Sequence, residues 1–142
     1  MKKLCLLFPL LLLLCACAQK PTVTLAKVEA AALSSYGADD YFLADGDYVT
    51  ASFPDARHLK HARIYLSKEN DGREFGIFEL SDSRYISETV GAIRRYLENE
   101  EQSVRSLASL YPAAELAARL NRLDRVRIEC AGNVISYYLV EA

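Results

Sequence analysis

The sequence lacks most of the residues and patterns that identify an enzyme or a nucleic-acid-binding protein. It has no tryptophan and one methionine, and its 142 residues include only six glycines and four prolines. The scattered glycines form no phosphate-binding loop, and the Gly-x-Ser-x-Gly, Ser-x-x-Lys and HExxH patterns are missing. The formal net charge of −2 indicates no basic surface for nucleic acid. Composition therefore does not reveal a biochemical activity.

Long hydrophobic runs are also scarce, and the longest lies at the amino terminus. Lys2 and Lys3 precede an apolar run from Leu4 to Leu14, which Pro9 interrupts. A transmembrane helix needs about 20 apolar residues, so this run is too short to span a membrane. A short positive segment followed by such a run is typical of a signal peptide.

The residues Leu14-Cys15-Ala16-Cys17 at the end of this run resemble the bacterial lipobox. The resemblance implies cleavage before Cys17 and a diacylglycerol on its sulfur. Residues 1–16 would then be a lipoprotein signal peptide, 17–23 the lipidated cysteine with a short tether, and 24–142 a single domain. An ordinary secretory signal with an incidental cysteine is the alternative. Lipid chains would hold the protein on the outer face of the cytoplasmic membrane.

Local patterns in the remaining chain predict both helices and strands. Apolar residues at helical spacing predict helices over 24–35, from Ser81 or Asp82 to Leu107, and over 113–122. Alternation and turn residues predict two hairpins, 61–68 with 74–80 and 125–131 with 134–140, and a further short strand at 48–52. We therefore expect an α+β fold, an antiparallel sheet of about four strands (two hairpins) with helices packed on one face.

The order of these elements is similar to that of a known family. A strand at Glu74–Leu80, a long charged helix over 87–104, the Tyr111-Pro112 step and a closing hairpin with Gly132 at its turn follow the lipobox. From about Phe53 onward the chain resembles small lipoproteins, mostly of Firmicutes, catalogued as domain-of-unknown-function family 4358. The resemblance implies an extracytoplasmic lipoprotein module, and it carries no catalytic residues.

Two groups of side chains could in principle bind a metal ion. His58 and His61 form a His-x-x-His pattern beside Asp55, and imidazole and carboxylate groups suit zinc. The spacing is not that of one helical face and no cysteine completes the set, so solvated surface histidines are the better interpretation. We expect no metal site and no cofactor.

Four carboxylates lie in the short segment Asp39–Asp47, namely Asp39, Asp40, Asp45 and Asp47. Calcium favours such oxygens, but the order of ligands in an EF-hand is missing. The same carboxylates could form the acid and base of a glycoside hydrolase. Aspartate and glycine are also the residues that tight turns require, which is the simpler interpretation.

Tyrosines and one cysteine complete the candidate residues. Cys130 alternates with charged residues, so we expect it to face inward as a small apolar side chain. Tyr137 and Tyr138 must point to opposite faces of their strand, so that one can be in the core and the other outward. If Tyr85, Tyr96 and Tyr111 lie on one edge with Tyr138, the four would form a binding face for sugar or protein. Ordinary core and rim tyrosines are the alternative.

These observations favour a non-catalytic, membrane-anchored binding or accessory module of the cell envelope. Its expected partners are the membrane, through the lipid anchor, and an envelope protein or wall polymer, with no nucleic acid. The alternative function is a small cell-wall hydrolase that uses carboxylates of the Asp39–Asp47 segment.

Overall fold

The computed structural model describes residues 22–140 of the chain. The predicted signal peptide, Cys17 and most of the tether lie outside the described residues. The described part contains four α-helices, five strands and three short 3-10 turns. In chain order they are α1 (Leu25–Tyr36), η1 (Ala38–Asp40), β1 (Tyr41–Leu43), α2 (Gly46–Ser52), β2 (Leu59–Ser67), β3 (Glu74–Leu80), η2 (Ser83–Tyr85), α3 (Ile86–Ser106), η3 (Ala108–Leu110), α4 (Ala113–Asp124), β4 (Arg127–Ala131) and β5 (Val134–Leu139).

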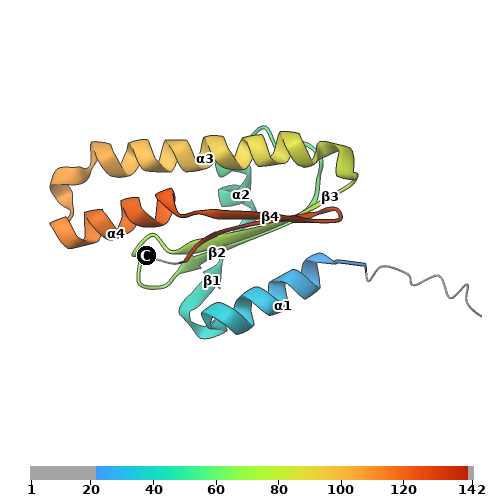
Figure 1. The fold of residues 1–142 in the computed structure, drawn as a ribbon, viewed down its shortest axis with the longest axis horizontal. Helices are drawn as coiled ribbons and strands as arrows, with labels where there is room; N and C mark the ends of the chain where they lie inside the picture. The colour runs from blue at the N-terminus through green and yellow to red at the C-terminus, as the bar shows by residue number, and fades with distance from the viewer. Residues whose placement is uncertain (1–21, 141–142) are drawn as a thin grey trace, which may run out of the picture.

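The strands form one antiparallel sheet in the order β1-β2-β3-β5-β4, which confirms the predicted α+β class (Figure 1). The sheet has five strands rather than about four, because Tyr41 and Leu43 of β1 pair with Ser67 and Tyr65 of β2. Three residues are too few for alternation to predict a strand. Pairing with β2 stabilises the extended conformation of β1, which the local sequence alone does not specify.

The two predicted hairpins are present with nearly the expected boundaries. The turn between β2 and β3 places Asn70 and Gly72 at φ values of 52° and 83°, in the left-handed region that asparagine and glycine tolerate best. The predicted first helix is also confirmed. Thr24 caps α1 by accepting the Lys27 N–H, and Gly37 ends the helix.

The segment Tyr48–Ser52 is a helix and not the strand that its alternation predicted. The Asp45 carboxylate accepts the Tyr48 N–H at 2.8 Å and so caps the first turn of α2. The Thr50 hydroxyl donates to the Gly46 carbonyl at 2.9 Å inside the same short helix. Local capping therefore overrides the β propensity of Tyr, Val and Thr.

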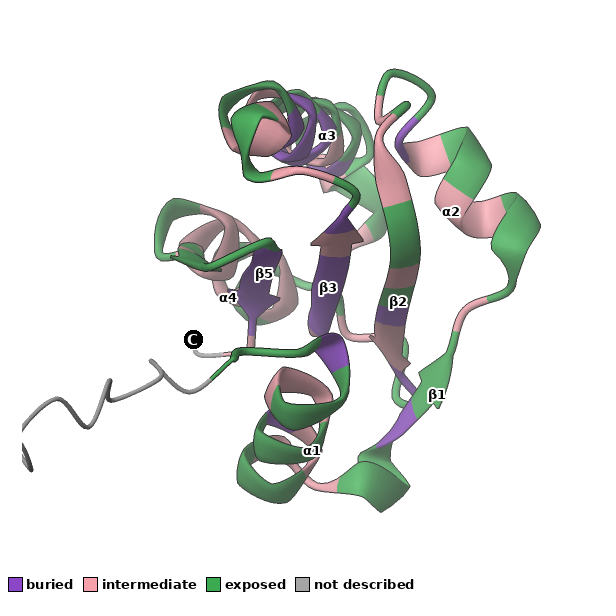
Figure 2. Cartoon of the chain, turned by 90° about the vertical axis from the view of Figure 1, so that its right-hand side faces the viewer, coloured by how far each residue is buried: buried purple, intermediate pink, exposed green. Residues whose placement is uncertain are grey.

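Helices cover both faces of the sheet, which corrects the prediction that they pack on one face. On β3, Phe75 and Ile77 pack against α1, whereas Phe78 and Leu80 join a second cluster with Ile93 of α3. Figure 1 shows α3 and α1 on opposite sides of the sheet, and Figure 2 shows that β3 and β5 are buried along most of their length. Strands that are apolar on both sides require cover on both sides.

Candidate functional site

The structure does not bring the four predicted binding tyrosines to one surface. Tyr96 lies in the core between α3 and the sheet, and Tyr138 is buried on the opposite face, next to α1. Tyr85 is half-buried and stacks on His58, with ring centroids 3.4 Å apart. Tyr111 is half-buried at the turn between α3 and α4. The predicted binding face is therefore wrong as a single surface, because its members are divided between two core layers and two loops.

Tyr137 and Tyr138 do point to opposite faces of β5, but neither is outward. Both side chains are buried, Tyr137 completely. Their strand lies between β3 and β4, and helices cover it from both sides.

The residues considered for a metal site are separated and have other contacts. Asp55 pairs with Arg95 at 3.3 Å, His58 stacks on Tyr85, and His61 is exposed on β2. Within residues 22–140 no three His, Cys, Asp or Glu side chains gather as metal ligands.

The carboxylates of Asp39–Asp47 are exposed and lie in turns or a helix start. Asp45 caps α2, and the Lys68 ammonium donates to the backbone carbonyl of Asp39 at 2.7 Å. These positions agree with the simpler interpretation of the segment as a turn and a cap.

Cys130 is exposed, which corrects the expectation that it faces the core. It lies on β4, the edge strand of the sheet, near the Gly132 turn. Alternation correctly predicted that Ile128 and Cys130 lie on the same face of β4. The core packs against this face at Ile128 but does not reach Cys130.

The sequence analysis missed a buried charged group, the carboxylate of Glu74. It is only 7% exposed and lies at the start of β3 on the side that packs against α3. Glu74 shares this side with Phe78 and Leu80 in the alternation of the strand. A charged residue on the apolar side of a predicted strand was the available signal.

Tyrosine hydroxyls are the hydrogen-bond donors to the Glu74 carboxylate. The Tyr137 hydroxyl donates to Oε1 at 2.8 Å, and the Tyr96 hydroxyl donates to Oε2 at 3.0 Å. The Tyr48 and Tyr96 hydroxyl oxygens are 3.0 Å apart, which extends the network to the half-buried edge of α2. We call these four residues the Glu74 cluster.

Gly76 makes room for the Glu74 cluster. It lies directly across from Tyr137 in the pairing of β3 with β5. A Cβ atom at position 76 would overlap the Tyr137 ring, so the ring can lie across β3 only because residue 76 has no side chain. This position lets the Tyr137 hydroxyl reach Glu74.

Burial changes the acid–base properties of this cluster. It raises the pKa of Glu74 to about 7, against the opposing effect of the two tyrosine hydrogen bonds and with a small contribution from Glu100. Burial, followed by the nearby Glu74 charge, also raises the pKa of Tyr137 and Tyr96 above the usual tyrosine range. The pKa of Glu74 therefore lies near neutral pH, in a side chain that is buried between the sheet and α3.

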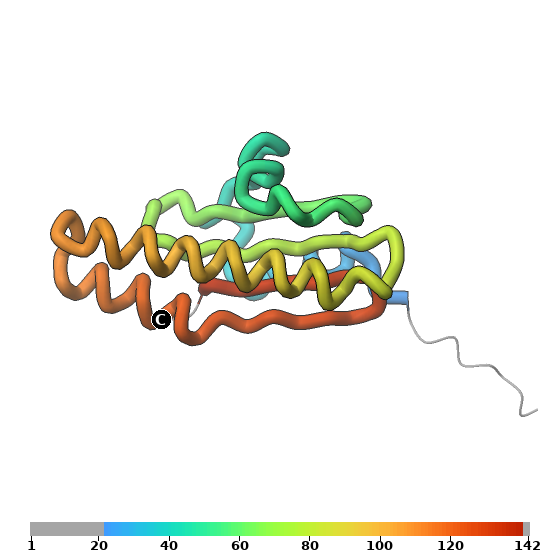
Figure 3. The backbone as a smooth tube through the Cα atoms, turned by 90° about the horizontal axis from the view of Figure 1, so that it is seen from above, coloured from blue at the N-terminus to red at the C-terminus, as the bar shows by residue number. Residues whose placement is uncertain are grey.

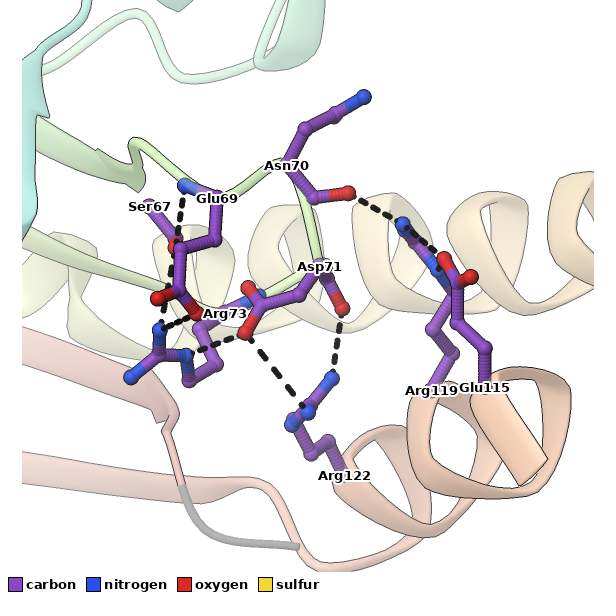
Figure 4. Close-up of polar contacts among 8 residues, drawn as sticks. All are labelled: Ser67, Glu69, Asn70, Asp71, Arg73, Glu115, Arg119 and Arg122. Carbon is purple, nitrogen blue, oxygen red and sulfur yellow. Dashed lines mark hydrogen bonds and ion pairs between the residues drawn. The ribbon is translucent and has the colours of Figure 1, made fainter.

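A second polar network joins the β2–β3 turn to α4, as Figure 4 shows. The Arg122 guanidinium donates to the Asp71 carbonyl at 2.6 Å, and the Arg119 guanidinium donates to the Asn70 carbonyl. Arg119 also pairs with Glu115 of its own helix at 2.9 Å. The two arginines are mostly buried, so their bonds hold the turn against α4. We call this network the turn–helix latch.

Asp71 is the central carboxylate of the latch. It accepts the Arg73 backbone N–H at 3.0 Å and the Arg73 guanidinium at 2.5 Å. Burial alone would raise the pKa of Asp71, but these hydrogen bonds, one from Ser67 and the Arg73 charge lower it below its usual value. Arg73 also pairs with Glu69 at 2.7 Å. Each acidic side chain of the latch therefore contacts a basic one.

The turn between α3 and α4 carries the most exposed large apolar side chains of this end of the domain. Leu107 is 42% exposed and Leu110 is 74% exposed. The Arg119 guanidinium lies 4.8 Å from the centre of the Tyr111 ring, so the turn is tied to the latch. Figures 1 and 3 show this turn at one end of the long axis and the start of α1 toward the other end. We call residues 107–112 the distal turn.

Comparison of the chain with family models, curated proteins and solved structures finds no match. The resemblance to family 4358 therefore stays a prediction. None of the helices within residues 22–140 is both long and apolar enough to cross a membrane.

Proposed function

We propose that this chain is a lipid-anchored module of the outer face of the cytoplasmic membrane that binds an envelope protein with its distal turn. The observation that carries the proposal is the exposure of Leu107 and Leu110 on one turn. Exposed apolar side chains that cluster often mark a protein-binding surface.

The position of the distal turn suits a chain that is anchored at Cys17. α3 has 21 residues and is therefore about 30 Å long at the rise of an α-helix. It runs along the domain from the end near the start of α1 to the end with the distal turn (Figure 1). An anchor joined to residue 22 would leave the distal turn at the far end of the domain.

The turn–helix latch supports the proposal because it fixes the surface next to the distal turn. Arg119 contacts the Tyr111 ring, Glu115 and the β2–β3 turn together. A surface that is already ordered loses less conformational entropy when it binds.

Leucine side chains favour a protein partner over a wall polymer, because they offer apolar contact and few hydrogen bonds for sugar hydroxyls. The hydrolase alternative gains no support from the cap and turn positions of the Asp39–Asp47 segment.

The test is photo-crosslinking in intact cells from an amino acid placed at position 110. We expect one protein adduct from this position, and its loss when Leu107→Ser is added. The matched control places the same amino acid at Leu43, which is 43% exposed on β1. Equal adducts from both positions, or an adduct with lipid only, would contradict the proposal.

The anchor has a separate test. Cys17→Ala removes the sulfur that the lipid would modify, so the variant should leave the membrane fraction and lose label from a fatty-acid probe. A variant that keeps both membrane association and label would show that the anchor assignment is wrong.

A further inference from the structure

The outer edge of β4 is an open strand edge. β4 is the last strand of the sheet on its side, and it pairs with β5 alone among the described strands (Figure 3). Ala131 and Val134 flank the two-residue turn and must be a hydrogen-bonded pair. By alternation, the N–H and C=O groups of Ile128 and Cys130 then point away from β5. These groups fit the backbone of another extended strand.

The charges of β4 are complementary to those of the same strand in the antiparallel direction. Arg127 and Glu129 flank Ile128 and lie on the same face. If Ile128 lies opposite Ile128 of a second copy, Arg127 lies opposite Glu129 of that copy, and the pair occurs twice. A register centred on Glu129 would place two carboxylates opposite each other. One centred on Cys130 would place Glu129 opposite Ala131 and Arg127 opposite Asn133, so that neither charge meets an opposite charge. Cross-strand pairs of opposite charge stabilise a sheet, whereas like charges destabilise it.

A groove beside β4 supplies an apolar surface for the same contact. Its volume is about 360 Å³, and Leu97, Leu123, Val126 and Ile128 form its apolar lining. Ile128 of a second copy would project into this region, because a hydrogen-bonded pair places both side chains on the same face.

The rim of the groove is charged and is also complementary to itself. It carries Arg94, Glu98 and Glu101 of α3. Neither Arg94 nor Glu98 has an ion-pair partner among residues 22–140. A two-fold axis through Ile128 would make the two α3 helices antiparallel, which brings Arg94 of one copy toward the acidic residues of the other.

We infer that two copies of this chain pair through β4 in the antiparallel direction, with Ile128 at the two-fold axis, to form one ten-stranded sheet. This contact uses a different surface from the distal turn and goes beyond the proposed function. The helices α1 of both copies lie on the same side of the joined sheet.

The test is cysteine crosslinking of the full chain in cells. In the inferred register, position 126 lies opposite Cys130 of the second copy. The variant Val126→Cys, treated with a short bismaleimide, should therefore give a covalent dimer of this chain. The control Val126→Cys with Cys130→Ser should give none, because the two introduced thiols are then four residues apart along the paired strands.

Charge exchange tests the register in the Val126→Cys background. Arg127→Glu or Glu129→Arg alone places like charges opposite each other twice, so each should reduce the crosslinked fraction by about tenfold. The double variant Arg127→Glu, Glu129→Arg restores both opposite-charge pairs and should recover the dimer. Arg127 also donates to the Tyr36 hydroxyl at 2.5 Å, and the double variant lacks this bond too, so recovery separates the interface from damage to the fold.

Any one of three results would overturn the inference. No covalent dimer from Val126→Cys, a dimer that the charge exchange does not affect, or a crosslink to a different protein would each show that β4 does not pair with itself in this register.

Discussion

Asp71 in the β2–β3 turn and Glu74 at the start of β3 lie three residues apart, yet their pKa values shift in opposite directions. Burial raises the pKa of Glu74 to about 7, whereas the hydrogen bonds and charge of Arg73 lower the pKa of Asp71. The partners of Glu74 are tyrosine hydroxyls, which donate hydrogen bonds without a positive charge. The partners of Asp71 include two arginines.

The comparison shows that hydrogen bonding alone does not hold a buried carboxyl in its charged form. Both carboxylates accept two or more hydrogen bonds, so the difference lies in burial and in the charge of the donors. The Glu74 cluster therefore makes the fold sensitive to rising pH, and the turn–helix latch makes it sensitive to falling pH.

The largest effect should come from Glu74→Gln. The folded protein binds the Glu74 proton more tightly than the unfolded chain, in which the pKa of this group is 4.5. The stability that Glu74 contributes is therefore full below pH 4.5 and is lost as the pH rises to about 7. The loss is about 3 kcal/mol. Glutamine is uncharged, so the variant should be more stable than the original chain by about 2–3 kcal/mol at pH 8 and nearly equal to it at pH 4. Urea unfolding followed by circular dichroism at the two pH values measures this. A variant that is less stable at pH 8 would contradict the role of Glu74.

Tyr137→Phe should have the next largest effect. It keeps the ring that packs over Gly76 but removes the hydroxyl that donates to Oε1 of Glu74. Loss of a buried hydrogen-bond donor costs about 1–3 kcal/mol, and more of this cost should appear at pH 8, where Glu74 is ionised. Thermal unfolding of the single variant and of Tyr137→Phe with Glu74→Gln measures the coupling. Simple additivity of the two changes would show that the hydroxyl and the carboxylate act separately.

Asp71→Asn should have a smaller effect, of opposite sign to that of Glu74→Gln. It removes the negative charge that Arg73 and Arg122 contact and should destabilise the fold by about 1 kcal/mol at pH 7. Because the pKa of Asp71 is lowered, this stability is present above the unfolded pKa of 3.8 and is lost as the pH falls through the folded value. Urea unfolding at pH 7 and in acid should therefore show the variant converging on the original chain as the pH falls.

Glu69→Gln should have the smallest effect. Glu69 contacts Arg73 at 2.7 Å, but its side chain is 75% exposed. An exposed ion pair contributes less than about 1 kcal/mol, so the change in unfolding free energy should be below about 0.5 kcal/mol and should vanish in high salt. A loss as large as that of Asp71→Asn would show that the latch depends on its exposed charge.

Local signals predicted most of the elements but not the layers or the Glu74 cluster. Thr24, the Asp71-Gly72 turn and Pro112 act on their immediate neighbours, and the structure confirms the helix, hairpin and helix boundary that they predict. Residues 75–78, Phe-Gly-Ile-Phe, form a continuous run without a polar side chain, which was a signal for cover on both faces.

The Glu74 cluster could not be assembled from the sequence because its members come from four separate elements. Tyr48, Glu74, Tyr96 and Tyr137 meet only when α2 and α3 pack on β3 and β5. The spacing of these residues along the chain does not predict which of them come into contact in the folded protein. The predicted tyrosine face failed for the same reason, since burial of Tyr96 and Tyr138 depends on which helix covers each face.

The strand order has a consequence for the biosynthesis of this protein. β5 is the fifth strand in chain order, yet it lies inside the sheet between β3 and β4. A ribosome or a translocation pore that releases the chain amino end first delivers β1, β2 and β3 while the inner edge of β3 is still open. The sheet can be completed only after β5 has emerged, so completion of the fold waits for this strand. Until then the exposed edge of β3 is a place where a chaperone can bind and where premature aggregation can begin.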